Sequence, residues 1–256
     1  MSQSGETADV LRGGVQTGAV GISPVLALTN NPQSTLARLA DAVVGSSAGP
    51  EIGVAATKTF ICQVISAAAL MISALVGMNR VSARSAAALV DDLRRVPDQL
   101  AAASAVAKCV IPPLVDQFAA EAGFIFIGRG GLGLPYAAEG ALKLKELTYR
   151  WAEHYPAGEL KHGPLALVGV GTPVIVIDNG DPKLAGNVAE VRARGGHVIT
   201  VGCAGGAIPV VDDPAAPWGP IAATVPLQIL ARTMALALGG RDVDKPRNLA
   251  KSVTVE

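Results

Sequence analysis

Three charged residues near the middle of the chain have the spacing of one helical face. Glu139, Lys143 and Glu146 stand at positions i, i+4 and i+7 of the segment EGALKLKE, so a helix would bring their side chains together. A carboxylate can carry a proton between C1 and C2 of a sugar in aldose–ketose isomerisation, and a neighbouring ammonium stabilises the developing oxyanion. Such a row is also typical of a solvated ion-pair face, and both interpretations stay open at this point.

A loop rich in hydroxyl groups opens the chain. The segment Ser2-Gln-Ser-Gly-Glu-Thr7 precedes an expected helix over residues 8–18. Free backbone N–H groups at a helix N-terminus attract anions, and hydroxyls beside them complete an anion cradle. The same residue types are ordinary helix caps, which is the simpler interpretation. A phosphate loop in an α/β fold normally follows a buried strand, and here only Met1 precedes it, so we expect the first domain to be truncated.

Two more side chains could take part in proton transfer or covalent chemistry. His162 lies between a lysine and a Gly-Pro turn, and histidine is suited to proton transfer near neutral pH, although a loop histidine is more often an ordinary surface residue. We interpret His154 and His197 as structural. Lys251 follows Pro246 and an apolar Leu-Ala pair, which favours a docked tail. A desolvated lysine can form a Schiff base with a ketose carbonyl, although terminal segments are often frayed.

The elements that must position these side chains alternate between strands and helices. Strands are expected where short apolar runs end at turn residues. The expected strands are 25–29, 124–127, 173–177 and 197–201, and the expected helices are 8–18, a long one ending at 78, 82–100, 135–150, 187–194 and 225–238. This alternation predicts an α/β protein with parallel sheets and βαβ crossovers. We place a domain boundary near residue 108, giving a first domain over 1–107 and a second, with the C-terminal tail, over 108–256.

The glycine-rich segment Gly128-Arg-Gly-Gly-Leu-Gly133 follows an expected strand, as a nucleotide-binding loop would. We interpret it as a loop that ends before a helix beginning at Pro135, because proline suits the first turn of a helix. The glycine spacing departs from Gly-x-Gly-x-x-Gly and no matching acidic residue follows. A dinucleotide cofactor is therefore not expected.

The composition argues against several classes of protein. Half of the 256 residues are apolar, 16% are charged and the formal net charge is zero. These values argue against a disordered chain and against nucleic acid or an anionic membrane surface as the main partner. Cys62, Cys109 and Cys203 lie far apart, so neither a disulfide framework nor a metal site is expected, and a reducing cytoplasm is the simplest setting.

The start of the chain does not have the pattern of a signal peptide. The segment Phe60–Met78 is uncharged and long enough to cross a membrane. Its polar residues Gln63, Ser66 and Ser73 and its many alanines favour instead a buried helix or a helix at a subunit contact.

Five blocks of sequence follow one another along the chain. They are SQSGETAD (2–9), GPEIGVAATK (49–58), EGALKLKE (139–146), GELKHGPLA (158–166) and DVDKPRNLAKSVTVE (242–256). Together they resemble the isomerase portion of the glucosamine-6-phosphate synthase family, over essentially the whole chain. The resemblance implies two tandem sugar-isomerase (SIS) domains, each a flavodoxin-like parallel sheet between helices, with the first domain truncated at its N-terminus.

The resemblance also implies where a sugar phosphate would bind. Val54 would line the sugar through its backbone, together with Ala250. The residues implied to hold the phosphate are Ser2, Gln3, Ser4 and Thr7.

The family reaction converts fructose 6-phosphate and glutamine into glucosamine 6-phosphate and glutamate, and the resemblance implies no metal or organic cofactor. Glu146 would move the proton between C1 and C2, with Lys143 beside it. His162 would assist ring opening from the partner subunit of a homodimer with shared active sites. Lys251 would form an imine with open-chain fructose 6-phosphate.

Two departures from the family pattern matter. Ala56 replaces a serine found in many members, which we expect to be a small change. Members also carry a glutaminase domain with an N-terminal cysteine nucleophile, and a Cys-Gly-Thr-Ser type loop in the first SIS domain, neither of which is in this sequence. We therefore expect the chain not to hydrolyse glutamine by itself, so that ammonia would come free or from a separate glutaminase.

Two alternatives remain. One is a related SIS-type deaminase that runs the reverse chemistry without a glutaminase. The other is a non-catalytic sugar-phosphate-binding module. The presence of Glu146, His162 and Lys251 together argues against the second alternative.

Overall fold

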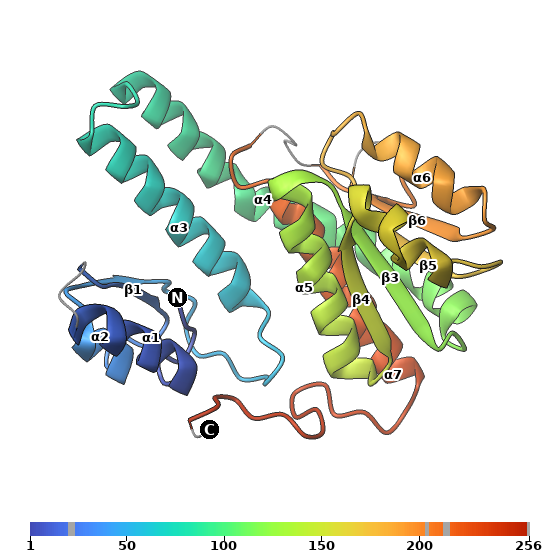
Figure 1. Cartoon of the computed structure of the whole chain (residues 1–256), viewed down its shortest axis with the longest axis horizontal. Helices are drawn as coiled ribbons and strands as arrows, with labels where there is room; N and C mark the ends of the chain where they lie inside the picture. Colours follow the sequence, from blue (N-terminus) through green and yellow to red (C-terminus); the bar gives the residue numbers. More distant parts are fainter. Residues whose placement is uncertain (20–23, 203–204, 212–215, 255–256) are drawn as a thin grey trace. The chain divides into compact units, whose positions relative to one another are not determined.

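The computed structural model describes residues 1–19, 24–202, 205–211 and 216–254 (Figure 1). Its contacts divide the chain into two compact units. The first unit consists of Met1–Leu93 and the C-terminal segment Asp244–Glu256, and the second of Arg94–Val243. Each unit is described by itself below.

The first unit has a small parallel sheet with helices around it. Its elements are α1 (Ala8–Ala19), β1 (Leu26–Thr29), α2 (Thr35–Leu39), β2 (Ala42–Gly45), α3 (Lys58–Gly77) and the first part of α4 (Ala83–Phe118). Strand β1 pairs in parallel with β2. Ser2 forms a further parallel bridge with Thr29, the last residue of β1. All residues of β1 except Leu26 are buried. The sheet therefore positions the hydroxyl-rich loop that follows Ser2.

The second unit contains, within the described residues, a five-stranded parallel sheet in the order β4-β3-β5-β6-β7. Its elements are the second part of α4, β3 (Gly123–Gly128), α5 (Gly130–Thr148), β4 (Trp151–Pro156), η1 (Ala157–His162), η2 (Pro164–Leu167), β5 (Pro173–Ile177), α6 (Leu184–Arg192), β6 (His197–Gly202), β7 (Ile208–Pro209), η3 (Ile221–Ala223) and α7 (Thr224–Ala237). In this sheet the chain begins at β3, adds β4 on one side of it, and then adds β5, β6 and β7 on the other side. This is the flavodoxin-like order, which confirms the predicted α/β class with parallel sheets.

The core of the second unit lies on both faces of this sheet. One face is covered by α5 and α7, and the other by α6 and the two short 3₁₀ helices (Figure 1). Ile125 and Ile127 of β3 belong to the apolar cluster on the α6 side. Phe126 lies on the other face, where a side-chain carbon added to Gly140 would come within 2.9 Å of its ring. Gly140 therefore lets α5 lie close to the sheet, and α5 carries the charged row.

Helix α5 begins earlier than the sequence predicted. The helix starts at Gly130, so that Pro135 lies inside it and the expected loop up to Gly133 is largely helical. A side-chain carbon on Gly128 would come within 2.5 Å of the Gly133 backbone. Gly128 and Gly133 are therefore explained by close strand–helix packing, which the loop interpretation overlooked, whereas a side-chain carbon on Gly130 or Gly131 would meet nothing within 4 Å.

Other boundaries differ in similar ways. Helix α4 continues to Phe118 through three prolines, well beyond the expected end at residue 100. Strands β2, β4 and β7 were not predicted, because they are short or show alternating polar and apolar residues rather than apolar runs. The strands β1, β3, β5 and β6 and the helices α1, α3, α6 and α7 lie close to their expected positions.

Helix α3 is long and apolar enough to cross a membrane by length and composition. Among its residues only Thr59 and Ile72 are buried, so the expectation of a core helix is wrong for this chain. The other expectation, a helix at a subunit contact, stays a prediction.

The C-terminal tail has its contacts in the first unit, whereas the sequence placed it with the second domain. The backbone N–H of Ala8 donates to the carbonyl of Val253 at 3.0 Å, and that of Val54 donates to Asp244 at 2.9 Å. The expected boundary after residue 107 falls inside α4, and the contact-based division falls in the same helix after Leu93. The SIS domain limits of 1–107 and 108–256 stay a prediction.

Candidate functional site

The hydroxyl-rich loop is held in place by the sheet of the first unit. The backbone N–H of Ser2 donates to the carbonyl of Leu28 at 3.1 Å, and that of Asn30 donates to Gln3 at 3.2 Å. Gly5 has a φ of +68°, which only glycine adopts without strain. These contacts bring Ser2, Gln3, Ser4 and Thr7 into one tight turn before α1.

Two hydroxyls of this loop accept hydrogen bonds from its own backbone. Ser2 Oγ accepts from Gly5 N at 3.0 Å, and Ser4 Oγ accepts from Glu6 N at 3.1 Å. Ser2 Oγ also lies 3.3 Å from Thr7 Oγ1. These two hydroxyls therefore shape the turn before α1, and their bonds are not caps of the helix, which begins at Ala8. They lie beside the N-terminus of α1, as the anion-cradle interpretation requires.

The C-terminal tail docks on this loop. Ser252 Oγ lies 3.1 Å from Ser4 Oγ. The carbonyl of Val253 accepts from Ala8 N at the start of α1, and so satisfies a helix N–H that has no intrahelical partner. Lys251 and the exposed Ala250 precede these anchored residues. The docked tail predicted from the sequence is present, and it places Lys251 next to a residue that touches the loop.

A second loop, residues 49–57, also contacts the tail. Lys251 Nζ donates to the carbonyl of Gly53 at 2.5 Å. The N–H of Val54 is occupied by the carbonyl of Asp244, so this N–H is not free to bind a sugar. The first unit thus brings together the expected phosphate residues, Val54, Ala250 and Lys251.

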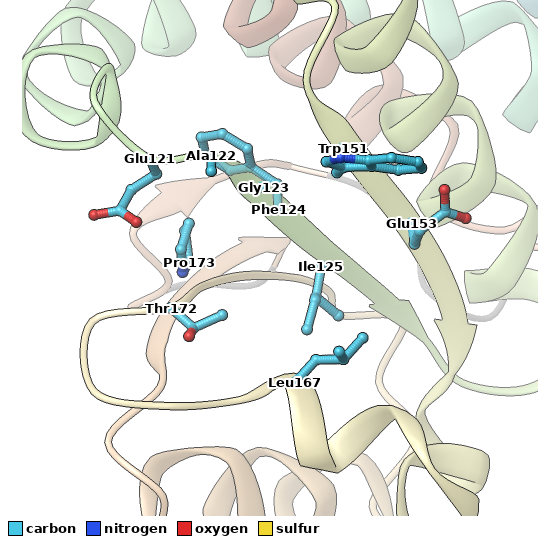
Figure 2. A pocket seen from close by; sticks show the side chains of 10 residues that line it. All are labelled: Glu121, Ala122, Gly123, Phe124, Ile125, Trp151, Glu153, Leu167, Thr172 and Pro173. Atoms are coloured by element: carbon cyan, nitrogen blue, oxygen red, sulfur yellow. The ribbon is translucent and has the colours of Figure 1, made fainter.

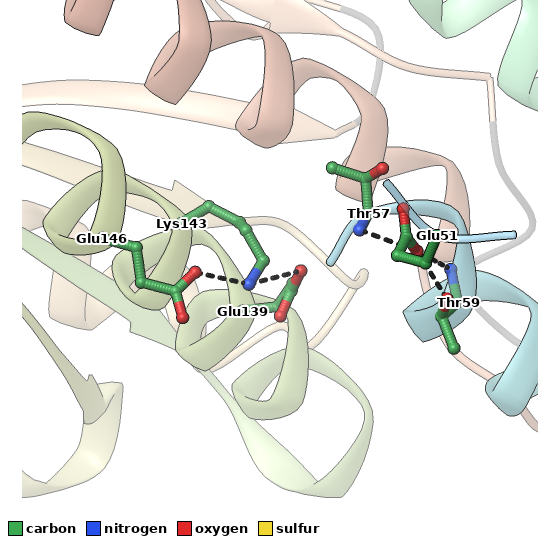
Figure 3. Close-up of polar contacts among 6 residues, drawn as sticks. All are labelled: Glu51, Thr57, Thr59, Glu139, Lys143 and Glu146. Carbon is green, nitrogen blue, oxygen red and sulfur yellow. Dashed lines mark hydrogen bonds and ion pairs between the residues drawn. The ribbon is translucent and has the colours of Figure 1, made fainter. Parts of the chain in front are cut away.

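Glu51 fixes the conformation of the 49–57 loop (Figure 3). Its Oε2 accepts hydrogen bonds from Thr59 N at 2.9 Å, Thr59 Oγ1 at 2.5 Å and Thr57 N at 3.3 Å. Burial opposes ionisation, but the hydrogen bonds from Thr59 and Thr57 and the charge of Lys251 hold the pKa of the Glu51 carboxyl below its ordinary value. Glu51 thereby ties the loop to the N-terminus of α3.

The charged row on α5 in the second unit is largely buried rather than solvated. Lys143 Nζ lies 2.8 Å from Glu146 Oε2 and 3.7 Å from Glu139 Oε1, so the lysine stands between the two carboxylates (Figure 3). The side chains of Lys143 and Glu139 are each 5% exposed and that of Glu146 is 18% exposed. The interpretation as a solvated ion-pair face is therefore wrong.

Glu139 has the most perturbed environment of this row. Burial, against the opposing charge of Lys143, raises the pKa of Glu139 to about 7. Gln228 of α7 hydrogen-bonds the same carboxyl. The row thus holds a carboxyl that takes up and releases a proton near neutral pH, a property that the helical spacing alone did not reveal.

His162 lies at the end of η1 and is exposed. Its side chain is 74% exposed, and its Nε2 is 3.9 Å from Glu159 Oε2. The expectation of an exposed histidine is therefore met. Among the described residues of the second unit, His162 pairs with Glu159, whereas Glu146 pairs with Lys143.

Two cavities of the second unit are separate from these residues. One, of about 290 Å³, lies at the amino ends of the central strands and is lined by Trp151, Ile125 and Leu167, among others (Figure 2). Open α/β sheets bind ligands at the opposite, carboxyl ends. There, a second cavity of about 430 Å³ follows β5 and β6, and the adjacent Arg129 pairs with Asp181 at 3.2 Å.

No group of three or more His, Cys, Asp or Glu side chains that could hold a metal occurs in the described part of the chain. Cys62 and Cys109 are free thiols. Cys203 lies outside the described residues.

Comparison with known proteins identifies the family. The SIS domain model matches residues 1–73 and 118–210, well over half of the chain. The chain therefore belongs to the SIS domain family.

Among curated relatives, the chain is similar to glutamine–fructose-6-phosphate aminotransferases (isomerizing). It is 44% identical to the enzyme of Pseudomonas aeruginosa and 46% identical to that of Halobacterium salinarum, in each case over 100% of this chain and 43% of the relative. The chain thus spans less than half the length of these relatives. The predicted resemblance to this family is confirmed.

Solved structures agree with this assignment. The C-terminal domain of glucosamine-fructose-6-phosphate aminotransferase from Francisella tularensis matches with a TM-score of 0.85 and 34% identity, over 95% of this chain and 71% of that one. Glucosamine-6-phosphate deaminase from Thermotoga maritima matches with a TM-score of 0.76 and 27% identity, over 98% of this chain and 73% of that one.

Proposed function

We propose that the chain is the sugar-phosphate isomerase part of a glucosamine-6-phosphate synthase, which converts fructose 6-phosphate and ammonia into glucosamine 6-phosphate and water. The observation that carries the proposal is the docked tail. The hydrogen bond between Ser252 and Ser4 puts Lys251 beside a hydroxyl-rich loop at a helix N-terminus. An amine next to an anion cradle suits a phosphorylated ketose.

In the proposed reaction the loop residues hold the phosphate group. The neutral amine of Lys251 attacks C2 of the open-chain ketose, and loss of water gives an imine. Ammonia then replaces Lys251 at C2, which regenerates the free amine. Val54, through its carbonyl side, and Ala250 would line the sugar.

Glu146 is the proposed base of the isomerisation step. It takes the proton from C1 and returns it to C2, which converts the ketose imine into the amino aldose. Lys143, 2.8 Å from the Glu146 carboxylate, orients that group and balances the charge that develops on the substrate. The relatives that match over the whole chain carry names that fit this chemistry.

We further propose that the chain acts in the cytoplasm as a homodimer in which His162 serves the partner subunit's sugar during ring opening. The exposure of His162 supports a role outside its own subunit. Ammonia would come from solution or from a separate glutaminase. The alternative is the deaminase reaction, which is the reverse chemistry; the higher identity to aminotransferases favours synthesis.

The proposal is tested by the variant Glu146→Gln. Interconversion of the ketose and aldose phosphates should fall roughly 100-fold or more, because a positioned base contributes that order of magnitude. The upward thermal shift with glucosamine 6-phosphate, which reports binding to the folded chain, should persist. Glu153→Gln, which alters a half-exposed carboxylate on β4, is the matched control and should keep normal turnover. Normal turnover in Glu146→Gln would refute the assignment, and a wild-type chain that binds the sugar phosphate without converting it would be a binding module.

A further inference from the structure

Two lysines of the first unit bind the same short loop. Lys58 Nζ donates to the carbonyl of Pro50 at 2.5 Å, and Lys251 Nζ donates to the carbonyl of Gly53 at 2.5 Å. The two acceptors are three residues apart. One lysine comes from the start of α3 and the other from the C-terminal tail, so one loop binds two amines that are far apart in sequence.

Lys58 stands at a helix position that is electrostatically unfavourable for a cation. It is the first residue of α3, where the positive end of the helix dipole disfavours a cation. Glu51 supplies an anion at the same helix end, where it accepts hydrogen bonds from Thr59 and Thr57. Lys58 therefore does not stabilise α3 through the helix dipole, and it binds the loop that also binds Lys251. This combination indicates a role other than helix stability.

We propose that Lys58 is a positioning residue for Lys251: its positive charge, fixed on the same loop, favours the neutral amine of Lys251, which is the form that attacks a sugar carbonyl. A second cation close to a lysine is one of the ways in which proteins make an amine nucleophilic near neutral pH. This inference rests on the proposed role of Lys251 and adds the residue that prepares it.

The charged groups around Lys251 act in both directions. Partial loss of water around the amine is the main effect and lowers the pKa of Lys251; the charge of Glu51 raises this pKa, and the charge of Lys58 lowers it. The effect of Glu51, whose carboxylate accepts from three donors at the start of α3, is larger than that of Lys58, so Lys58 offsets part of the stabilisation that Glu51 gives the charged amine. Asp244 precedes Lys251 in the same tail, and its carboxylate lies near Gly53.

Two other elements bring titratable groups near the tail. On α3, the Cys62 thiol interacts with Glu51 and Lys58, and burial raises its pKa. On the α1 side, Glu6 is directed to α2, where its carboxylate accepts from Thr35 N at 2.8 Å. Asp9 lies in the first turn of α1. Lys58 is thus a cation whose charge acts on the amine of Lys251.

The test measures the amine of Lys251 without any substrate. Trace acetic anhydride acetylates neutral amines only, so the extent of labelling of the Lys251 peptide, measured by mass spectrometry across a pH series, reports the fraction of neutral amine. Lys58→Met should move the labelling curve of Lys251 to higher pH and lower the labelling at pH 8 by roughly threefold or more. Lys58→Arg keeps the charge and should leave the curve at its wild-type position. Glu51→Gln should move it in the opposite direction.

Each outcome supports or overturns the inference. An unchanged Lys251 curve in folded Lys58→Met, or the same displacement in Lys58→Arg, would overturn it, because charge would then not be the cause. Lys58→Gln, which keeps an N–H donor near Pro50, replaces Lys58→Met should that variant fail to fold. If the curve moves as expected but borohydride traps no fructose 6-phosphate on Lys251, the proposed function fails while the charge effect stands. If borohydride traps the sugar but the curve does not move, the charge effect fails while the proposed function stands.

Discussion

Replacement of the buried carboxyl Glu139 by glutamine should remove a large pH dependence from the stability of the second unit. Burial raises the pKa of Glu139 from 4.5 to about 7. Since a tenfold change in an ionisation constant corresponds to about 1.4 kcal/mol, this rise is worth about 3 kcal/mol. The folded state holds the proton more tightly than the unfolded state, so the contribution is fully present below pH 4.5 and is lost as the pH rises through about 7.

Wild-type protein should therefore lose stability relative to Glu139→Gln by about 2 to 3 kcal/mol between pH 5 and pH 8. The assay is urea unfolding followed by tryptophan fluorescence. The chain has two tryptophans, and both Trp151 and the buried Trp218 belong to the second unit. The fluorescence signal thus reports the unit that contains Glu139.

Leu142→Gln is the matched control. It adds the same side chain at an exposed position of the same helix and introduces no ionisable group. Its stability curve should run parallel to that of the wild type across the pH range. A parallel curve for Glu139→Gln as well would refute the reasoning, because Glu139 would then not hold its proton more tightly in the folded state.

Two further predictions concern the hydroxyl-rich loop. Gly5→Ala should lower the free energy of unfolding of the first unit by at least about 1–2 kcal/mol, because a side chain at a φ of +68° is strained and its first carbon would lie 2.1 Å from Ser34 Oγ; denaturation followed by circular dichroism measures this, and an unchanged midpoint would contradict it. Ser4→Ala should weaken binding of glucosamine 6-phosphate roughly threefold to tenfold, because it removes the contact with Ser252. Ser85→Ala, which alters an exposed hydroxyl pair, is its control, and equal binding by both variants would count against the role of Ser4.

The sequence predicted best those elements that depend on local patterns. The apolar runs 124–127 and 173–177 are buried on both faces of a parallel sheet, and such strands have continuous apolar sequences. The edge strand Trp151–Pro156 has an alternating pattern with exposed residues. It was missed because a short alternating run resembles a loop unless its neighbour in the sheet is known.

The helix boundaries failed where packing overrides local preference. The segment Gly128–Gly133 was interpreted as a loop, yet Gly128 at the end of β3 and Gly133 in α5 are needed because their backbones come into contact. Prolines did not end α4. In both cases the deciding contacts are between segments, and the pattern along one segment does not contain them.

The sequence predicted which side chains of α5 meet at the candidate site, but it did not predict that they are buried. The spacing of Glu139, Lys143 and Glu146 correctly predicted that they meet on a helix. Their burial depends on how α5 packs on the sheet and on α7, which the spacing does not reveal. Glu51 was overlooked as well, because its role appears only where the chain folds back on the start of α3. A glutamate preceding a helix that begins with Thr-Lys-Thr was the available signal.

The most direct test of the central claim is reduction of the protein with sodium borohydride in the presence of fructose 6-phosphate, followed by peptide mass spectrometry. Borohydride converts an imine between a lysine and a ketose into a stable amine, so the modified lysine is identified by its mass. We predict one sugar phosphate per chain, attached to Lys251, and none in Lys251→Arg. Labelling of another lysine, or turnover of the sugar phosphate by a chain that carries no label, would contradict the account.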